Sequence, residues 1–344
     1  MDNNNSFPVP TTDDSYLWDI WMSSFHYAAL QIGVEKGFFE LLKDNPLSTS
    51  EIAQKTGYSY RSIEAFFGLF TALGLLKKYN QKHYLAPIAD TYLLESSSFF
   101  WGGIINYRTD DETRYLLRNM LEKEKSGNIG EQIHEEWEAG KMDPEKAEKF
   151  TSAMHSTSVA PAEGAARKLN LKRHQLLLDV AGGSGSYAMA IAAKNSQMRA
   201  TVFELPEVAP YTDKFIKKLG LESQVSVKGG NMFNPSHWPP SYDVHFFSHI
   251  FHDWDQETCQ WLADQSFATL QGKGKIVLHE MLLNDGADDN ATALAFSLKM
   301  MTSMKGKQYR FEELKSILEK AGFTNVHTTP SFGHFSLIIA EKPA

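Results

Sequence analysis

The stretch LLLDVAGGSGSYAMAIA, residues 176–192, joins an apolar run that ends in an acid to a glycine-rich turn and a segment of small residues. A buried strand, then Gly182, Gly183 and Gly185, and then a helix would place bare backbone N–H groups at the helix N-terminus. Such a turn can hold a dinucleotide, a phosphate or another adenosine-bearing cofactor, and it also occurs for packing alone. It indicates a doubly wound α/β domain and leaves the ligand open.

The rest of the C-terminal half repeats this alternation of strand and helix. Apolar runs separated by helical segments are QLLLDV, RATVFEL, QVSV, YDVHFFSHI, GKIVLHEM and FSLIIAEK. Strands that are apolar on both faces predict a parallel sheet covered on both sides by helices. TNVHTT and HFSLIIAE are separated only by a short loop, so we expect these two to pair antiparallel at one edge.

Two acids narrow the choice of ligand for the glycine turn. Asp179 ends the first strand, and Glu204 ends the second strand, 25 residues further on. A carboxylate at Asp179 would repel a pyrophosphate but suits a cofactor with a positive centre, and Glu204 can accept both ribose hydroxyls. The pair favours S-adenosylmethionine over a nicotinamide dinucleotide, which stays open as an alternative.

Composition excludes several classes of protein. The chain has 344 residues, a net charge of −8 and one cysteine, Cys259, so we expect two domains, no disulfide and a cytoplasmic location. No apolar run is long enough to span a membrane, and no cluster of lysine and arginine predicts nucleic-acid binding. The polar, acidic residues 1–13 predict a disordered tail rather than a signal peptide.

The N-terminal half predicts a winged helix. Ser48 and Glu51 form a capping box ahead of one helix, a second helix carries phenylalanines at helical spacing, and LLKKYNQKHYLAP predicts a hairpin. Because the second helix has a single arginine, Arg61, beside Glu64, we expect it to serve packing rather than DNA binding.

From about residue 15 to 342 the chain resembles the two-domain small-molecule O-methyltransferases, a group that includes plant caffeate and flavonoid, animal hydroxyindole, and bacterial polyketide and phenazine enzymes. The motifs that carry the resemblance are LSTSEIAQKTG, LFTALGLLKK, DVAGGSG, FELPEV, GGNMF and, most specific, HIFHDWDQETC. It implies a dimerisation domain at 14–100, a helical connector to the substrate pocket at 101–170 and a class I methyltransferase domain at 171–344. That domain would hold a mostly parallel seven-stranded sheet with the last strand antiparallel, and the enzyme would be a homodimer.

The resemblance also implies roles for individual residues. His252 would be the general base that deprotonates a hydroxyl, Glu280 would orient it, and Asp253 is a further partner. Gln308 stands where the family has a second acid. Asn231 also replaces an acid, but its amide can still hydrogen-bond the adenine amino group. Residues that would bind the cofactor are Asp179, Gly182, Gly183, Gly185, Glu204, Leu205, Asn231, Met232, Phe233, Ser248 and Trp254. Residues that would bind an aromatic substrate are Met154, His155, Phe296, Met300 and Met304.

Three alternatives remain open on the sequence. The first keeps S-adenosylmethionine but methylates nitrogen or carbon, although a histidine base favours a hydroxyl acceptor. The second is a dehydrogenase that binds a nicotinamide dinucleotide at the glycine turn, and the third is a regulator that binds DNA through the winged helix. No residues at metal-ligand spacing accompany the His252 turn, so we expect no metal site.

Overall fold

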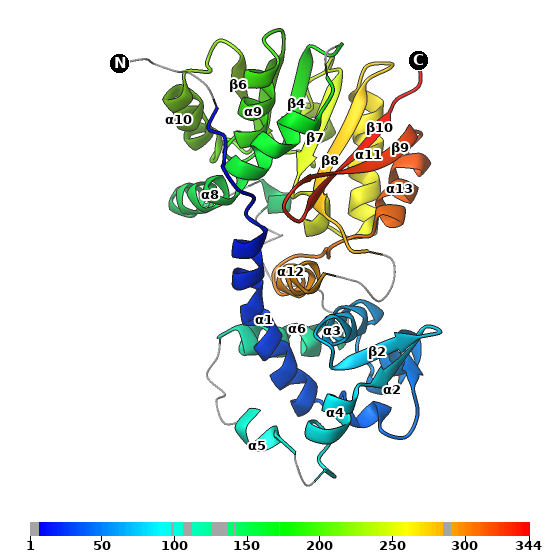
Figure 1. The fold of residues 1–344 in the computed structure, drawn as a ribbon. Coiled ribbons are helices and arrows are strands. Elements are labelled where there is room, and N and C mark those ends of the chain that lie inside the picture. Colours follow the sequence, from blue (N-terminus) through cyan, green and yellow to red (C-terminus); the bar gives the residue numbers. More distant parts are fainter. Residues whose placement is uncertain are drawn as a thin grey trace. The chain divides into compact units, whose positions relative to one another are not determined.

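A computed structural model describes residues 7–97, 100–105, 112–125, 137–140, 142–171, 173–284 and 290–344. The chain divides into two compact units. The sheet unit comprises residues 1–15, 133–282 and 311–344, and the helical unit comprises residues 16–132 and 283–310. Figure 1 shows the elements of both units.

The sheet unit is built on a seven-stranded sheet in the order β6-β5-β4-β7-β8-β10-β9. The first five of these strands are parallel, and β10 pairs antiparallel with both β8 and β9. The predicted class of fold is therefore confirmed. The strands are β4 (Leu176–Val180), β5 (Arg199–Glu204), β6 (Val225–Gly229), β7 (Val244–Ser248), β8 (Lys275–Met281), β9 (Thr324–Phe332) and β10 (Phe335–Glu341).

Helices cover both faces of this sheet, because right-handed crossovers that run in opposite directions from β4 and β7 place their helices on opposite sides (Figure 1). One face carries α8 (Pro144–Lys168), α9 (Ser186–Lys194) and α10 (Ala209–Leu219), and the other carries α11 (Gln256–Thr269) and α13 (Phe311–Lys320). β4 pairs with β5 on one side and with β7 on the other. The order of strands reverses here, and such a reversal opens a crevice at the carboxyl edge of a sheet.

The helical unit contains the elements predicted for the N-terminal half. Ser48 caps α2 and makes both hydrogen bonds of the capping box with Glu51. The described elements of this unit are α1 (Ser15–Glu35), η1 (Glu40–Leu42), β1 (Leu47–Ser48), α2 (Thr49–Thr56), α3 (Tyr60–Ala72), β2 (Leu76–Tyr79), β3 (Lys82–Leu85), α4 (Pro87–Tyr92), α5 (Gly102–Ile105), α6 (Glu112–Lys125) and α12 (Ala291–Met301).

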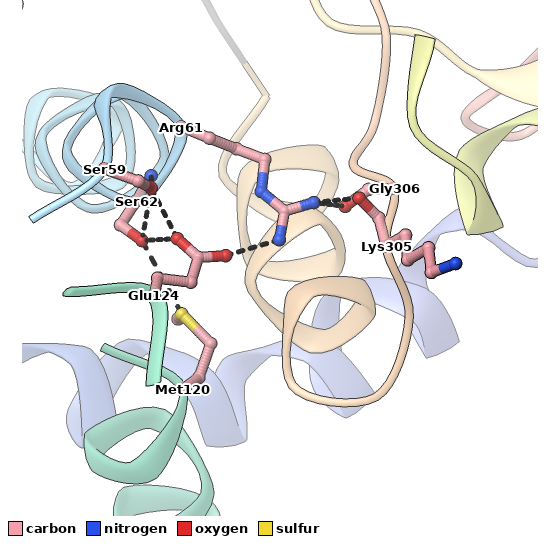
Figure 2. Close-up of polar contacts among 7 residues, drawn as sticks. All are labelled: Ser59, Arg61, Ser62, Met120, Glu124, Lys305 and Gly306. Carbon is pink, nitrogen blue, oxygen red and sulfur yellow. Dashed lines mark hydrogen bonds and ion pairs between the residues drawn. The ribbon is translucent and has the colours of Figure 1, made fainter. Parts of the chain in front are cut away.

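A polar cluster fixes one end of α3 inside the helical unit (Figure 2). The guanidinium of Arg61 pairs with the carboxylate of Glu124 and donates to the carbonyls of Lys305 and Gly306. The Glu124 side chain, which is only 3% exposed, also accepts hydrogen bonds from serine hydroxyls at the start of α3. The one arginine of α3 is thus committed to internal contacts, which supports a packing role for this helix.

The units divide the chain differently from the predicted domains. Residues 283–310 belong to the helical unit because α12 packs on α3, and Gly68 lets the two helices approach: a Cβ there would lie 2.9 Å from Leu294. Residues 133–171 belong to the sheet unit, because α8 packs along α9.

The N-terminal tail also differs from the expectation. Residues 1–6 lie outside the described part of the chain, but Phe7 is buried and belongs to the apolar core cluster that also contains α8 alanines such as Ala162. No helix within the described ranges is both long and apolar enough to cross a bilayer.

Candidate active site

The glycine turn follows β4 at the carboxyl edge of the sheet and has little room for side chains on one side. A Cβ at Gly182 would lie 2.6 Å from the carboxylate of Asp179. Gly183 has a φ of +54° and nothing within 4 Å of a would-be Cβ, so its backbone borders open space. The turn therefore exposes its backbone to a ligand on one side and packs on Asp179 on the other.

Glu204 connects the end of β5 to this turn. One carboxylate oxygen accepts the backbone N–H of Gly183 at 2.8 Å, and the other accepts the N–H of Leu205 at 2.7 Å. Thr212, from α10, donates to the Gly183 carbonyl at 2.6 Å. The predicted cofactor residues of β4, the turn and β5 are thus brought together, each in a defined orientation.

The two carboxylates of this region are buried. Burial raises the pKa of Asp179 to about 7 and raises that of Glu204 above its ordinary value. Asp179 Oδ2 accepts the N–H of Ala188 at 3.2 Å, whereas Oδ1 has no hydrogen-bond partner among the residues that the structure describes. A buried carboxylate oxygen without a donor suits a cationic ligand. The site therefore fits the ammonium and sulfonium groups of S-adenosylmethionine, with Glu204 left to receive ribose hydroxyls.

The predicted base and its predicted partner meet at the same edge of the sheet. His252 lies in η3 (Phe251–Asp253), directly after β7, and is 4% exposed. Its Nδ1 lies 3.0 Å from Oε2 of Glu280, which is at the end of β8. The other oxygen of Glu280 accepts the backbone amides of Ile250 at 3.2 Å and Phe251 at 3.0 Å. Glu280 therefore contacts both the imidazole and the turn that carries it.

Asp253 and the hydrogen-bonded pair of Ser248 and His279 also lie at this edge of the sheet. Oδ1 of Asp253 lies 3.4 Å from Nε2 of His252, so the ring has an acid near each nitrogen. Ser248, at the end of β7, is paired through its hydroxyl with Nδ1 of His279 at 3.2 Å. Burial lowers the pKa of His279 to about 3, so this second histidine stays neutral.

The residues predicted around the adenine are found on two turns of the sheet unit. The rings of Phe233 and Trp254 meet edge to face with centroids 4.7 Å apart. The carbonyl of Met232 accepts a hydrogen bond from Nε1 of Trp238 at 2.7 Å. Asn231 uses its side-chain amide in protein contacts: Oδ1 accepts the N–H of Phe233 at 2.8 Å, and Nδ2 donates to the carbonyl of Glu138 at 2.9 Å.

The predicted substrate residues divide between the two units. Met154 and His155 lie on α8 in the sheet unit, whereas Phe296, Met300 and Met304 lie in the helical unit. Gln308, which was predicted among the catalytic residues, also lies in the helical unit. His155 hydrogen-bonds Ser186 through Nδ1 at 3.0 Å and stacks on Phe215 at 3.9 Å, so its ring is directed to α9 and α10. The backbone amide of Gln308 donates to Ser297 at 3.2 Å.

Two contributors were missed by sequence reasoning. Thr212, which holds the Gly183 carbonyl, is a threonine within a helix with no pattern to mark it. Ser186 begins α9 and joins His155 to Ser184, whose hydroxyl lies 2.8 Å away. Only its position behind the third glycine could have signalled a role, because serine is common at the start of helices.

Comparison with known proteins identifies the family to which the chain belongs. A family model for an O-methyltransferase domain matches residues 116–324. The tetracenomycin polyketide synthesis 8-O-methyl transferase of Streptomyces glaucescens is 28% identical over 329 residues, covering 95% of this chain and 96% of that protein. The L-tyrosine C(3)-methyltransferase of Streptomyces lavendulae is 26% identical, covering 97% of this chain and 94% of that protein.

A solved structure, an O-methyltransferase family 2 protein from Planctomyces limnophilus in complex with apigenin, superposes with a TM-score of 0.87 at 26% identity, over 99% of this chain and 100% of that one. The family match covers more than half of the chain, and the buried carboxylates and glycine turn fit the cofactor. The chain therefore belongs to the O-methyltransferase domain family and is an S-adenosylmethionine-dependent O-methyltransferase.

Proposed function

We propose that the enzyme methylates a hydroxyl group of a small aromatic molecule, with His252 as the general base. The observation that carries this proposal is the contact of 3.0 Å between Nδ1 of His252 and Glu280. Of the two carboxylates beside the ring, Glu280 lies nearer to Nδ1, at 3.0 Å, than Asp253 does to Nε2, at 3.4 Å. The nearer acid favours the tautomer with its proton on Nδ1, which leaves Nε2 as the basic atom of the ring. A phenolic hydroxyl is a poor nucleophile until its proton is removed, whereas an amine attacks through its neutral lone pair and loses its proton afterwards, so a base beside the acceptor favours a hydroxyl.

The chain's own residues provide binding, orientation and a proton acceptor. S-adenosylmethionine supplies an electrophilic methyl group on a positively charged sulfur that leaves readily. Asp179 and Glu204 hold its charged and ribose ends at the glycine turn, and Nε2 of His252 receives the hydroxyl proton as the acceptor oxygen reacts. The carboxylates of Glu280 and Asp253 stabilise the imidazolium that results.

Relatives support an aromatic acceptor and define the alternative. The names of the Streptomyces glaucescens and Planctomyces limnophilus proteins point to a polyketide and to apigenin, whereas the Streptomyces lavendulae relative is named for methylation of carbon. The test is incubation of the enzyme with a labelled methyl donor and a panel of phenols, hydroxyindoles and aromatic polyketides. Label on oxygen that is lost in His252→Ala supports the proposal, and label on carbon or nitrogen contradicts it.

We also infer that the chain acts as a homodimer through α1. Five of its large apolar side chains are exposed, although neighbouring ones such as Phe25 are buried in the same unit. The exposed residues are Tyr16, Leu17, Ile20, Trp21 and Tyr27. A face of this kind on one helix is typical of an obligate interface, for which we expect more than about 2,000 Å² of buried area. Light scattering that gives the mass of one 38.8 kDa chain at micromolar concentration would contradict the dimer.

A further inference from the structure

Both ends of the Asn231 side-chain amide form hydrogen bonds with the protein backbone, which recognition of adenine alone would not require. It follows β6, and the Gly230 N–H immediately before it donates to the Glu204 carbonyl at 2.8 Å, so it lies beside the residue that we propose binds the ribose. Its Oδ1 accepts the N–H of Phe233, which stabilises its own turn. Its Nδ2 donates at 2.9 Å to the carbonyl of Glu138, which is 93 residues earlier in the chain.

The segment that receives this hydrogen bond is shaped to fit against the amide. Gly140 is the last residue of a turn in which its N–H donates to the Trp137 carbonyl at 3.1 Å. Its φ is +65°. A Cβ at Gly140 would lie 2.7 Å from Nδ2 of Asn231, so a larger residue would force the segment away. Gly140 therefore serves two needs at once, a left-handed backbone and a close approach to Asn231.

The same segment covers the turn that follows Glu204. Trp137, Met142 and Tyr211 pack around Ala147, Leu205 and Val208. The hydroxyl of Tyr211 donates to the carbonyl of Pro144 at 3.1 Å, and Asp143 caps α8 through the amides of Glu145 and Lys146. Residues 137–140 and 142–147 thus contact both the β5–α10 turn, through Trp137 and Met142, and Asn231, through Glu138 and Gly140.

From these contacts we propose that Asn231 is a positioning residue that holds residues 137–140 over the adenosine side of the cofactor site, and that cofactor retention depends on its amide as a hydrogen-bond donor. This inference rests on the proposed placement of the cofactor at Asp179 and Glu204. It also explains why an amide stands where the family has an acid: a carboxylate has no proton to donate, and it would face the Glu138 carbonyl with a second acceptor.

Asn231→Asp separates this proposal from adenine recognition because the two roles predict opposite results. A carboxylate would accept the adenine amino group at least as well as an amide, so a residue that reads adenine would bind the cofactor equally or more tightly after the change. The donor role predicts weaker binding, because the partly buried carbonyl of Glu138 would lose its partner. We expect the affinity for S-adenosylhomocysteine, measured by titration calorimetry on the full chain, to fall roughly tenfold.

Asn234 offers a matched control three residues away. Its Oδ1 accepts the N–H of Ser236 two positions on, as Oδ1 of Asn231 accepts that of Phe233. Its Nδ2, however, is hydrogen-bonded to Nε2 of His237 at 3.1 Å and not to the Glu138 carbonyl. Asn234→Asp therefore introduces the same charge on the same turn without touching residues 137–140. We expect its affinity for S-adenosylhomocysteine to stay within about twofold of the original protein.

Gly140→Ala tests the segment from its own side. The variant keeps the Asn231 side chain but prevents residues 137–140 from approaching it closely. We therefore expect the affinity for S-adenosylhomocysteine to fall about as much as in Asn231→Asp. Hydrogen exchange of residues 137–151 should be faster in both variants than in Asn234→Asp, with and without S-adenosylhomocysteine. Unchanged or tighter binding in Asn231→Asp, or exchange in 137–151 that does not change, would overturn the proposal.

The original protein serves as the reference for these measurements. Failure of the original protein to bind S-adenosylhomocysteine would instead overturn the cofactor placement itself, so the two failures are distinguishable. Thermal unfolding of each variant without ligand separates a local change from loss of the fold, since Asn231→Asp keeps the acceptor for Phe233 and should unfold near the temperature of the original protein.

Discussion

Glu280 contacts His252 and the backbone that carries it: Oε2 lies 3.0 Å from Nδ1, and Oε1 accepts the amide of Phe251 at 3.0 Å. One carboxylate at the end of β8 therefore orients the ring and anchors η3 after β7. Because β7 and β8 are parallel neighbours, Ser248 is in register with His279, and the residues that follow them meet at the same edge.

His252→Ala is expected to lower turnover by about two to four orders of magnitude, the usual contribution of a general base. Cofactor affinity should be unchanged, since the residue lies after β7 while the glycine turn lies after β4. Steady-state kinetics with a phenolic acceptor and calorimetry with S-adenosylhomocysteine measure the two effects. Undiminished turnover would remove His252 from the mechanism.

Glu280→Gln is expected to lower turnover by about tenfold or more while keeping the fold, because an amide oxygen can still accept the Ile250 and Phe251 amides. What is lost is the negative charge that stabilises the imidazolium. Asp253→Asn is the comparison: its carboxylate is farther from the ring, at 3.4 Å, and the side chain is 25% exposed, so its effect should be smaller. Equal effects of the two variants would assign the orienting role to both acids.

Glu204→Ala is expected to weaken cofactor binding by about 1 to 3 kcal/mol, the cost of hydrogen bonds lost at a charged acceptor. The Gly183 amide also loses its partner, so the glycine turn should become less ordered. Glu222→Ala removes the same kind of side chain from an exposed position after α10 and should not change affinity. If calorimetry gives the same dissociation constant for Glu204→Ala, the ribose assignment is wrong.

Cofactor binding is expected to depend on pH through Asp179. Burial raises the pKa of this carboxyl from 3.8 to about 7, so its contribution to the stability of the cofactor-free protein is present below pH 3.8 and is lost as the pH rises through 7. A cationic ligand favours the ionised form, so affinity should rise with pH up to about 7, and binding below that pH should release a proton. Calorimetry in buffers of different ionisation enthalpy counts the proton.

Asp179→Asn is the control for that pH dependence. It should bind S-adenosylhomocysteine more weakly and with a smaller pH slope, and the slope that remains should have the same sign because burial also raises the pKa of Glu204. An unchanged slope in Asp179→Asn would show that another group titrates.

Arg61→Met is expected to lower the free energy of unfolding of the helical unit by about 3 to 5 kcal/mol, because it leaves a buried carboxylate at Glu124 without its cation. The double variant with Glu124→Met should recover part of that loss. Lys149→Met breaks an exposed pair with Glu145 and should cost less than about 1 kcal/mol. Denaturant unfolding measures all three, and a small effect of Arg61→Met would show that the cluster adds little stability.

The sequence by itself determined the features that depend on local pattern. The apolar runs predicted the strands, because side chains buried on both faces of a sheet leave few other choices, and β9 and β10 pair as their short loop requires. Asp179 and Glu204 were singled out because they end neighbouring strands, and residues at the carboxyl ends of parallel strands meet at one edge of the sheet. The roles of His252 and Glu280 came from the motif HIFHDWDQETC and the family resemblance that it carries. The capping box at Ser48 is equally local, since both of its hydrogen bonds lie within four residues.

Tertiary structure alone decided the contacts between residues far apart in the chain. Nothing in the spacing of Asn231 and Glu138, or of Thr212 and Gly183, indicates that they bond. The same holds for α12, which joins the helical unit because it packs on α3 more than 200 residues earlier in the chain. Helix packing depends on the shapes of two faces together, so a periodicity that shows one apolar face cannot show which surface will cover it.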